Sequence, residues 1–164
     1  MGTARRLILI LLVVGSCAGC DRLSKSYAES WLPEAQPLSF FSESVRLQLT
    51  YNQGAFLSLG SSLPQSWRKI VFRTGIACLL FAVLGYTLFF APPRPWSICA
   101  ASLVLAGGAS NLIDRFIYDG YVLDFIQLGI GSLRTGVFNV ADVAIMAGVV
   151  MLLTGEPRGR RRRL

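Results

Sequence analysis

The chain has 164 residues, of which 53% are hydrophobic and only 15% are charged, and its formal net charge is +7. The length allows one compact domain, and so apolar a composition is unusual for a soluble domain of this size. Histidine is absent, which excludes mechanisms that need an imidazole base and most zinc sites.

The apolar residues gather in four segments, which predict an all-α membrane protein with four transmembrane helices, since a span needs about 20 residues. We expect the spans at about residues 5–24, 68–91, 95–114 and 137–154 of a single domain, 1–164. The first segment has a rival interpretation as a cleaved signal peptide, with a basic start and "CAGC" near its end. We expect the first segment to be retained. A small-residue cleavage box before a cysteine usually opens with leucine, whereas "CAGC" opens with Cys17, and "DRLSK" follows directly.

Basic residues set the expected orientation of these helices. Arg5 and Arg6 precede the first span, Arg94 lies in the short turn "APPRPW", and "RGRRRRL" ends the chain. The bias of Lys and Arg toward cytoplasmic loops places both termini in the cytoplasm. We expect the basic tail to be a cytoplasmic membrane anchor in reach of anionic lipid. We do not expect a nucleic-acid site, because no stacking aromatics or binding fold accompany the tail.

The first outer loop, about residues 25–67, is long and has a pattern of its own. The stretch from Ser44 to Leu59 holds the rough alternation "VRLQLTY", then "NQG", then an apolar run, which predicts short strands with a turn. The preceding "SWLPEAQPLSFF" contains Trp31 and two prolines, which suits a membrane interface. We therefore expect a small periplasmic β-cradle between the first two helices, lying on the outer leaflet.

Four aspartates lie in or beside the last two apolar segments. Asp114, Asp119 and Asp124 belong to "NLIDRFIYDGYVLDFI", and Asp142 belongs to "FNVADVAIMAGVV". A carboxylate in a membrane segment is a functional hypothesis by default. We expect Asp124 to lie in the loop between the two segments, where its apolar neighbours would carry it back to the depth of Asp142.

Two of these aspartates follow an asparagine by three residues. Asn111 precedes Asp114 and Asn139 precedes Asp142, so on a helix each asparagine shares a face with its aspartate and its amide can orient the nearby carboxylate.

Paired carboxylates are the best acid–base system left to a chain without histidine. Two close carboxyl groups cannot easily both ionise, so one keeps a proton while the other accepts one from water. Purely structural roles are also compatible with the sequence: an Asp114–Arg115 ion pair, an Asp21–Lys25 ion pair, and a solvated turn at Asp119. A transporter that uses aspartate as a proton or cation site, and a purely structural membrane subunit, are further alternatives.

Thiol and metal chemistry are disfavoured by the surroundings of the candidate residues. The four cysteines, Cys17, Cys20, Cys78 and Cys99, lie in apolar segments and no histidine can activate them. Arg115 beside Asp114, and the apolar neighbours of Asp124 and Asp142, argue against a cation site. We expect no metal and no cofactor.

Five short motifs, in this order, resemble those of the lipoprotein signal peptidase (type II signal peptidase) family. They are "DRLSK" with Asp21 and Lys25, "NQGAF" with Asn52 and Gly54, "SNLIDR" with Asn111, Asp114 and Arg115, "GYVLDFI" with Asp124, and "FNVAD" with Asn139 and Asp142. Two departures occur: Ser110 replaces the family's usual glycine, and "NQGAF" reaches its phenylalanine one residue early. The second departure bears on how the cradle fits substrate or inhibitor.

The resemblance implies an intramembrane aspartic endopeptidase of the bacterial inner membrane, with its active site facing the periplasm. Asp124 and Asp142 would be the catalytic pair. Asn52, Gly54, Asn111, Asp114, Arg115, Asn139, Asp21 and Lys25 would bind substrate or support the pair. The implied substrate is a prolipoprotein with a diacylglyceryl-modified cysteine, cut on the amino side of that cysteine. The partners would be these precursors and membrane lipid, and we expect a monomer.

Overall fold

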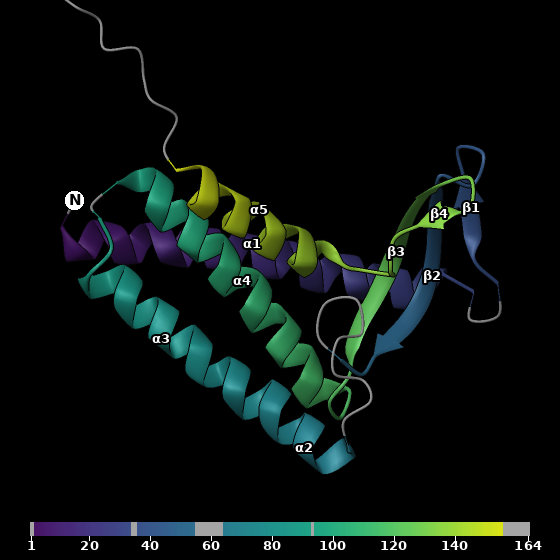
Figure 1. Ribbon diagram of the computed structural model, residues 1–164, viewed down its shortest axis with the longest axis horizontal. Helices are drawn as coiled ribbons and strands as arrows, with labels where there is room; N and C mark the ends of the chain where they lie inside the picture. The colour runs from purple at the N-terminus through teal and green to yellow at the C-terminus, as the bar shows by residue number, and fades with distance from the viewer. Residues whose placement is uncertain (1, 34–35, 55–63, 93, 156–164) are drawn as a thin grey trace, which may run out of the picture.

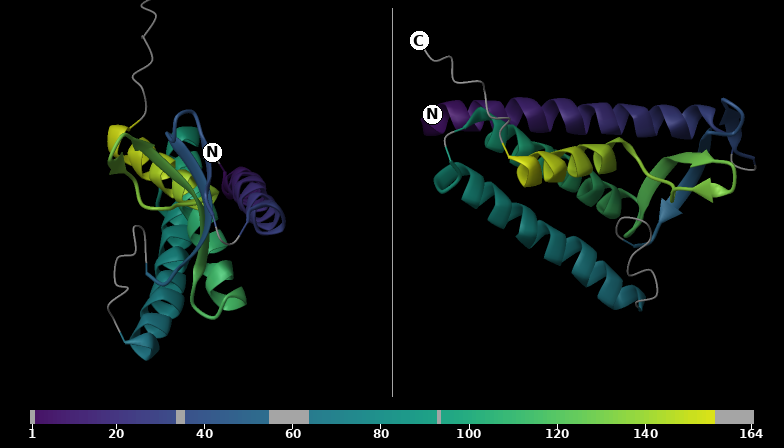
Figure 2. Two further views of the ribbon diagram at one scale, coloured as in Figure 1. Left: turned by 90° about the vertical axis from the view of Figure 1, so that its right-hand side faces the viewer. Right: turned by 45° about the horizontal axis from the view of Figure 1, so that its top comes forward.

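Four helical rods and one small sheet make up the computed structural model, which describes residues 2–33, 36–54, 64–92 and 94–155 (Figure 1). The rods are α1 (Thr3–Trp31), a continuous run of α2 (Gln65–Lys69), the π-helical η2 (Ile70–Gly75) and α3 (Ile76–Phe89), then α4 (Pro95–Ile117) and α5 (Val140–Thr154). The start of α1, the turn between α3 and α4, and the end of α5 lie at one end of the bundle (Figure 1 and Figure 2). The sheet and α2 lie at the other end.

Local sequence explains where the helices start and stop. Helix α1 ends at Trp31, and Leu32 is extended, as expected for a residue that precedes proline. Helix α4 begins at Pro95, in the first helical turn where a missing N–H costs nothing. It ends before Asp119 and Gly120, both of which have positive φ. Helix α5 begins with a capping box at Asn139.

Three of the rods are long and apolar enough to cross a membrane: Thr3–Trp31, Ser66–Phe89 and Pro95–Ile117. Helix α5 is apolar but has only 15 residues, or about 22 Å at 1.5 Å per residue. Large apolar side chains point outward along the rods, as Leu12, Phe81, Phe89 and Leu153 show. An outward apolar surface of this kind suits a lipid environment.

Helix α4 is the central helix, and it packs closely on α5. A Cβ on Gly107 would overlap the carbonyl oxygen of Ala141, and a Cβ on Gly148 would lie 2.6 Å from the carbonyl oxygen of Ala100. Small residues at such crossings let two helix backbones approach, which is how membrane helices associate without a hydrophobic driving force. This contact fixes α5 against α4.

The sheet has four antiparallel strands in the order β1-β2-β3-β4. They are β1 (Leu38–Phe40), β2 (Val45–Asn52), β3 (Val122–Ile130) and β4 (Leu133–Arg134). The strand expected from "VRLQLTY" is therefore present as β2. We expected the whole sheet to come from the segment between the first two helices. It does not, because β3 and β4 come from the segment between α4 and α5. Strand β1, in the stretch assigned to the interface, was not anticipated.

The expected element boundaries differ from the observed ones mainly at α1. This helix continues to Trp31, whereas the sequence suggested an end near residue 24 and a loop from residue 25. Asp21 and Lys25 are therefore helical and buried. Their charges are neutralised within the bundle, so hydropathy alone ended the helix too soon. The apolar run after "NQG" begins at residue 55 and falls outside the described residues up to residue 63.

Candidate active site

Asp124 lies in β3, at the end of the bundle that carries the sheet. It pairs with Thr50 across the β2–β3 ladder, and only 1% of its surface is exposed. Asn52 Nδ2 donates a hydrogen bond of 3.0 Å to Asp124 Oδ2. We expected this aspartate in a loop, but a paired strand holds it, so its position is fixed by backbone hydrogen bonds.

Asp142 lies in the first turn of α5 and closes a capping box with Asn139. The backbone N–H of Asp142 donates to Asn139 Oδ1 over 2.9 Å. The backbone N–H of Asn139 donates in turn to Asp142 Oδ2 over 3.2 Å. These reciprocal bonds satisfy two N–H groups that a helix start leaves unpaired, and they hold the Asp142 carboxylate at the start of the helix.

Asn139 connects the two aspartates. Its side-chain Nδ2 donates to Asp124 Oδ1 over 2.7 Å while its side-chain oxygen and backbone N–H bind Asp142. Asn139 is fully buried, so both carboxylates are held by one rigid residue. Asp124, from the sheet, and Asp142, from α5, are thus brought to the same place.

Asn111 orients the aspartate of the other motif and not that of its own. Its Nδ2 donates to Asp142 Oδ1 over 2.9 Å. Its Oδ1 accepts from Asn139 Nδ2 and from Lys25 Nζ, each over 3.1 Å. The i, i+3 spacing predicted a local pair with Asp114, but the buried α4–α5 contact brings Asp142 within reach instead.

A buried ionic cluster lies directly behind this amide pair. Lys25 Nζ is 2.6 Å from Asp21 Oδ2 and 2.7 Å from Asp114 Oδ2, and all three side chains are fully buried. Arg22 also pairs with Asp114. The Asp21–Lys25 ion pair is confirmed. The Asp114–Arg115 pair is wrong: Asp114 faces α1, where Arg22 and Lys25 supply the positive charge.

Asp21 ties three helices together. Asp21 pairs with Lys25 on its own helix. It also accepts a hydrogen bond of 2.6 Å from Ser110 Oγ on α4 and one of 2.8 Å from the backbone N–H of Ala141 on α5. Ser110 occupies the position where the family motif has glycine, and its hydroxyl donates to a buried carboxylate there. The departure from the motif is therefore accommodated by a hydrogen bond.

Arg115 links the end of α4 to the turn after β2. Its Nη2 donates to the carbonyl oxygen of Gly54 over 2.9 Å, and its Nη1 donates to that of Asn111 over 3.0 Å. The Gly54 N–H donates to Asn52 Oδ1 over 2.9 Å, which closes the turn in "NQG". The buried Nε of Arg115 has no partner among the described residues.

The surroundings of Asp124 favour its protonated form. Burial, and to a smaller extent the charge of Asp142, raises the pKa of Asp124 to about 7, against hydrogen bonds from Asn52 and Asn139 and the charge of Lys25. Removing a carboxylate from water disfavours its charged form. A carboxyl group with a pKa near neutrality is suited to give and take protons.

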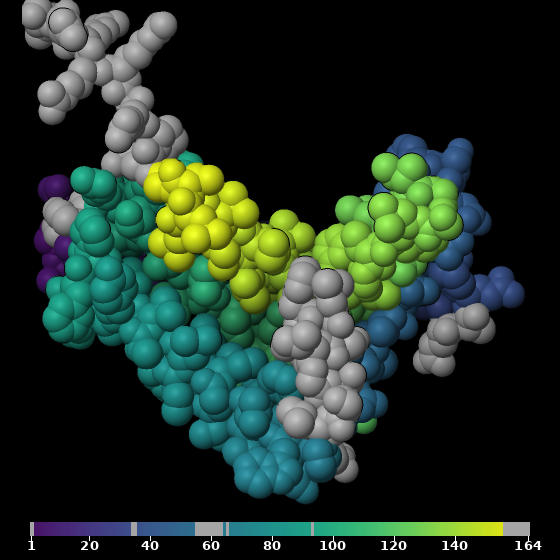
Figure 3. Space-filling model, viewed as in Figure 1, coloured from purple at the N-terminus to yellow at the C-terminus, as the bar shows by residue number. Residues whose placement is uncertain are grey.

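An apolar groove between α3, α4 and α5 reaches Asp142, and we call it the α3–α5 groove. It encloses about 320 Å³ and is lined by Ile76, Leu79, Leu80, Val104, Gly108, Asn111, Arg115, Asp142, Ile145 and Met146. Figure 3 shows the face on which α4 lies deeper between α5 and α3. Only three of these lining residues are polar, so the groove suits an apolar guest with one polar point of contact.

Asp119 lies apart from this site. Its side chain is 69% exposed and forms ion pairs with Lys69 and Arg73. Hydrogen bonds from Lys69 and Arg73 hold the pKa of Asp119 below its usual value. Its φ of 50° places it in the turn after α4. The four cysteines are free thiols, and the described residues contain no cluster of three potential metal ligands from His, Cys, Asp and Glu.

Comparison with known proteins identifies the family. A family model described as signal peptidase (SPase) II matches residues 11–156. The chain belongs to this family. Lipoprotein signal peptidases of Francisella tularensis subsp. mediasiatica (strain FSC147) and Xylella fastidiosa (strain M12) are both 37% identical to it. The first alignment covers 91% of this chain and 89% of the relative, and the second covers 88% and 84%.

Two solved structures of bacterial membrane enzymes, obtained by the in meso method, have a fold similar to that of this chain. Their TM-scores are 0.76 and 0.73, each at 22% identity, and each covers 88% of this chain. The resemblance to this peptidase family is therefore confirmed, as are a mostly helical fold with three membrane-capable helices and a small antiparallel sheet.

Sequence reasoning missed some of the residues around the site. Arg22 was unremarkable in "DRLSK", although its spacing from Lys25 puts both on one side of α1. Glu29 accepts hydrogen bonds from Tyr51 and Tyr118 at 3.2 and 2.9 Å, joining α1, β2 and the end of α4. No local pattern predicts these hydrogen bonds of Glu29, because they depend on how three segments that are distant in the sequence meet.

Proposed function

We propose that this chain is a membrane aspartic endopeptidase that removes the signal peptide from diacylglyceryl-modified prolipoproteins. Cleavage falls on the amino side of the lipidated cysteine. Family membership and the naming of both relatives as lipoprotein signal peptidases support the substrate class. The observation that carries the chemistry is the sharing of Asn139 by Asp124 and Asp142 in a buried site.

In this proposal Asp124 holds the proton and Asp142 is the base. The pKa of Asp124 near 7 supports the first assignment. Asp142 accepts hydrogen bonds from Asn111 Nδ2 and the Asn139 N–H, both of which stabilise a charged carboxylate. Asp142 takes a proton from a water molecule as its oxygen attacks the scissile carbonyl carbon. Asp124 gives its proton to the carbonyl oxygen, and a gem-diol forms.

Collapse of the gem-diol completes the reaction. Asp142 passes its proton to the nitrogen of the lipidated cysteine, and the C–N bond breaks. Asp124 recovers a proton from the hydroxyl group, which becomes the carbonyl of the released signal peptide. Each carboxyl group returns to its starting state, as general acid–base catalysis by a dyad requires.

The remaining residues bind substrate or hold the pair. Arg115 lines the α3–α5 groove, and its buried Nε lacks a partner among the described residues, so it donates to a substrate carbonyl. Asn52, Asn111 and Asn139 orient the carboxylates. Gly54 anchors the turn to Arg115, and the group of Asp21, Lys25 and Asp114 braces the helices behind them. The α3–α5 groove accepts apolar signal-peptide residues.

We infer a four-span topology in one domain, 1–164, with both termini cytoplasmic and the first helix retained. Arg5 and Arg6 belong to the start of α1 and Arg94 precedes α4. Both helix starts lie at the end of the bundle opposite the sheet (Figure 1), as the positive-inside bias requires. Helix α5 is the fourth span, and its short length brings Asp142 to the outer surface. The site then faces the periplasm from a bacterial inner membrane, where a lipid-anchored precursor remains.

Purified protein and a synthetic prolipoprotein test this function. We expect cleavage of the diacylglyceryl precursor before its cysteine in detergent, and far slower cleavage of the same peptide without lipid. Burial of acyl chains contributes about 0.8 kcal/mol per methylene group, which the unmodified peptide lacks. Equal rates for both peptides would contradict the proposal. Ion uptake into vesicles without cleavage would instead favour the transporter alternative.

A further inference from the structure

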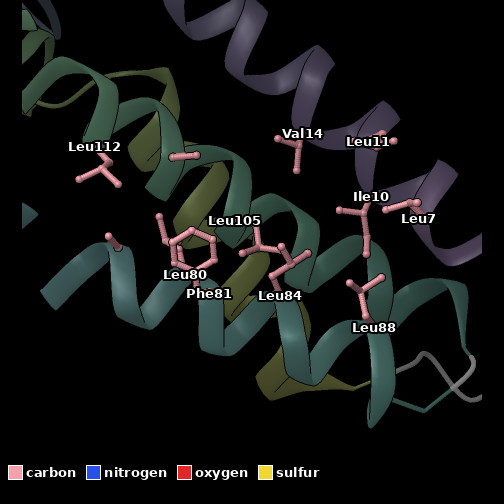
Figure 4. A pocket seen from close by; sticks show the side chains of 12 residues that line it. Leu7, Ile10, Leu11, Val14, Leu80, Phe81, Leu84, Leu88, Leu105 and Leu112 are labelled. Carbon is pink, nitrogen blue, oxygen red and sulfur yellow. The ribbon is translucent and has the colours of Figure 1, made fainter. Parts of the chain in front are cut away.

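Helix α1 contacts the rest of the bundle along two stretches of different chemistry. In its first half, Leu7, Ile10, Leu11 and Val14 line an apolar cavity of about 360 Å³ between α1, α3 and α4. Figure 4 shows α1 and α3 facing each other across this cavity. In its second half, the side chain of Lys25 is fully buried behind the candidate dyad. A buried charge is costly unless it is paired, so the contacts of this ammonium group indicate what it does.

An ammonium group has three donors and no acceptor, and that of Lys25 is directed at three oxygen atoms. Nζ lies 2.6 Å from Asp21 Oδ2 and 2.7 Å from Asp114 Oδ2. It also donates to Asn111 Oδ1 over 3.1 Å. The two carboxylates already pair with the charge and hold α1 against α4. The third bond is not needed for that purpose, and it leads toward the dyad.

Lys25 determines which way the amide of Asn111 faces. Because an ammonium group cannot accept a hydrogen bond, the amide oxygen must face Lys25, and Nδ2 is left to donate to Asp142 Oδ1 over 2.9 Å. Asn139 Nδ2 donates to the same amide oxygen over 3.1 Å, which favours the same orientation. In the opposite orientation the amide would turn its N–H groups toward a cation and its oxygen toward a carboxylate.

The amide groups around the dyad do not by themselves decide which aspartate is charged. Asp124 accepts hydrogen bonds from the side chains of Asn52 and Asn139. Asp142 accepts them from the side chain of Asn111 and the backbone N–H of Asn139. What differs is that the Asn111 amide also binds an ammonium group. Hydrogen bonds in a chain polarise one another, and a bond to an ionised group is stronger than a neutral one.

The charges near the dyad act on both of its members. Arg115 of α4 interacts through its charge with Asp124 and Asp142, and so does Lys25 of α1. The ionic cluster around Lys25 supplies the remaining charges, which are Asp21 and Arg22 of α1 and Asp114 of α4. Charge acting across space therefore does not separate the two aspartates, whereas the hydrogen-bonded connection through the Asn111 amide N–H leads to Asp142.

We propose that Lys25 is a positioning residue: through the amide of Asn111 it makes Asp142 the charged member of the dyad, and therefore the base. This inference rests on the proposed function and adds to it a role for Lys25 other than bracing the helices. No proton moves along the connection. When Asp142 takes a proton from water, it loses the charge that Lys25 stabilises through Asn111, which favours release of that proton to the leaving nitrogen.

The double variant Asp21→Asn/Lys25→Met tests this role with the full chain in detergent. It removes one charge of each sign, so the net charge of the cluster is kept while the bond to Asn111 is lost. Cleavage of the lipidated precursor is measured across the pH range and scaled to each variant's own maximum. We expect the acid limb of the profile to move to higher pH by about one unit or more, because the charged form of a carboxyl group depends on such bonds. An unmoved acid limb would overturn the proposal.

Arg22→Met is the matched control. Arg22 is a second cation of the same cluster, but it donates to Asp114 and its side chain is 31% exposed. This variant should lose stability while its acid limb stays in place. An equal shift in Arg22→Met would show that the cluster acts by its charge or by its effect on the fold, and would overturn the proposal.

A double-mutant cycle tests whether Lys25 acts through Asn111. Asn111→Ala should itself move the acid limb to higher pH. Adding Asp21→Asn/Lys25→Met to Asn111→Ala should then move it no further, because residues that act through one connection are not additive. Additive shifts would show that Lys25 acts on the dyad across space, and would overturn the proposed connection.

Nuclear magnetic resonance of the wild-type chain keeps the test decisive where the variants do not fold. With ¹⁵N-labelled lysine and asparagine, the resonances of Lys25 Nζ and Asn111 Nδ2 should change with pH at one shared midpoint. A Lys25 resonance that stays constant while that of Asn111 changes would overturn the proposal. This measurement needs no substrate. If the wild-type chain cleaves no precursor, the proposed function fails, whereas a shared midpoint would still assign the charge of Asp142 to Lys25.

Discussion

Asn139 Nδ2 donates a 2.7 Å hydrogen bond to Asp124 Oδ1, although Asn139 caps one helix and Asp124 lies in a strand of the sheet. The amide therefore joins the two architectural parts of the molecule at the candidate dyad. Neither the helices alone nor the sheet alone positions both carboxylates. Substitutions at this junction separate the chemistry of the site from the stability of the fold.

Asp124→Asn and Asp142→Asn should each abolish precursor cleavage while the protein stays folded. An amide keeps the shape and hydrogen-bonding capacity of the side chain but cannot exchange a proton, and loss of a general acid or base costs at least about 10²-fold. Cleavage of a lipidated precursor and thermal unfolding in detergent are measured for each variant. Asp119→Asn is the control and should keep nearly wild-type activity. Near-normal turnover by either dyad variant would rule out the assignment.

Asn139→Ala should reduce both activity and stability. It removes the helix cap, worth about 1 kcal/mol, and it frees the side chain of Asp124 from a direct partner. Asn139→Ser keeps a capping oxygen but cannot donate to Asp124 and Asn111 as the amide does. We expect the serine variant to recover part of the unfolding temperature but little of the cleavage rate. Equal recovery of both properties would mean that Asn139 acts only as a cap.

The sequence predicts the helices better than the sheet, because a membrane span depends on one property, local hydropathy, that can be summed along the chain. Strand β2 has an alternating pattern, and it was found. Strand β3, "VLDFIQLGI", is apolar and adjoins a span, so its periodicity does not separate a strand from a loop returning to the membrane. Its pairing with β2 joins residues that are 70 to 83 positions apart in the chain, so it leaves no local signal.

The site shows the same division between local and distant information. The Asp21–Lys25 ion pair follows from helical spacing alone. The partner of Asn111 does not, because it is set by the close α4–α5 crossing at Gly107. The ion pair between Arg22 and Asp114 likewise needs α1 and α4 side by side. Motif order suggests which residues matter, whereas their partners depend on packing.

Stability should fall as the pH rises from about 4 to about 7. The pKa of Asp124 is 3.8 in its ordinary state and about 7 in the folded protein, so the folded chain keeps a proton that the unfolded chain has lost. This contribution to stability is complete below the ordinary pKa and is lost as the pH passes through the folded pKa. Thermal unfolding of wild type and Asp124→Asn across this range checks the effect. The variant should show a flatter dependence, and parallel curves would contradict the assignment.

Cleavage should also decline above about pH 7, because in the proposed mechanism Asp124 must hold the proton that goes to the substrate carbonyl, and its pKa is about 7. Rates for the lipidated precursor from pH 5 to pH 9 check this decline. A rate that keeps rising through pH 9 would show that no protonated carboxyl group is required.

Lys25→Met should destabilise the folded protein strongly. Lys25 Nζ lies within 2.7 Å of both Asp21 and Asp114, and all three side chains are fully buried. Removing one partner of a buried ion pair typically costs about 3–5 kcal/mol, because the remaining charges stay desolvated.

Arg46→Met is the matched control, since Arg46 pairs with Glu43, whose side chain is 60% exposed, and exposed pairs contribute about 0–1 kcal/mol. Unfolding in detergent is measured for both variants and for Asp21→Asn/Lys25→Met. The double variant should be more stable than Lys25→Met alone, because it removes one of the two carboxylates left without their cation. If Lys25→Met instead unfolds like Arg46→Met, the buried cluster contributes little and the helices behind the dyad are held by apolar packing alone.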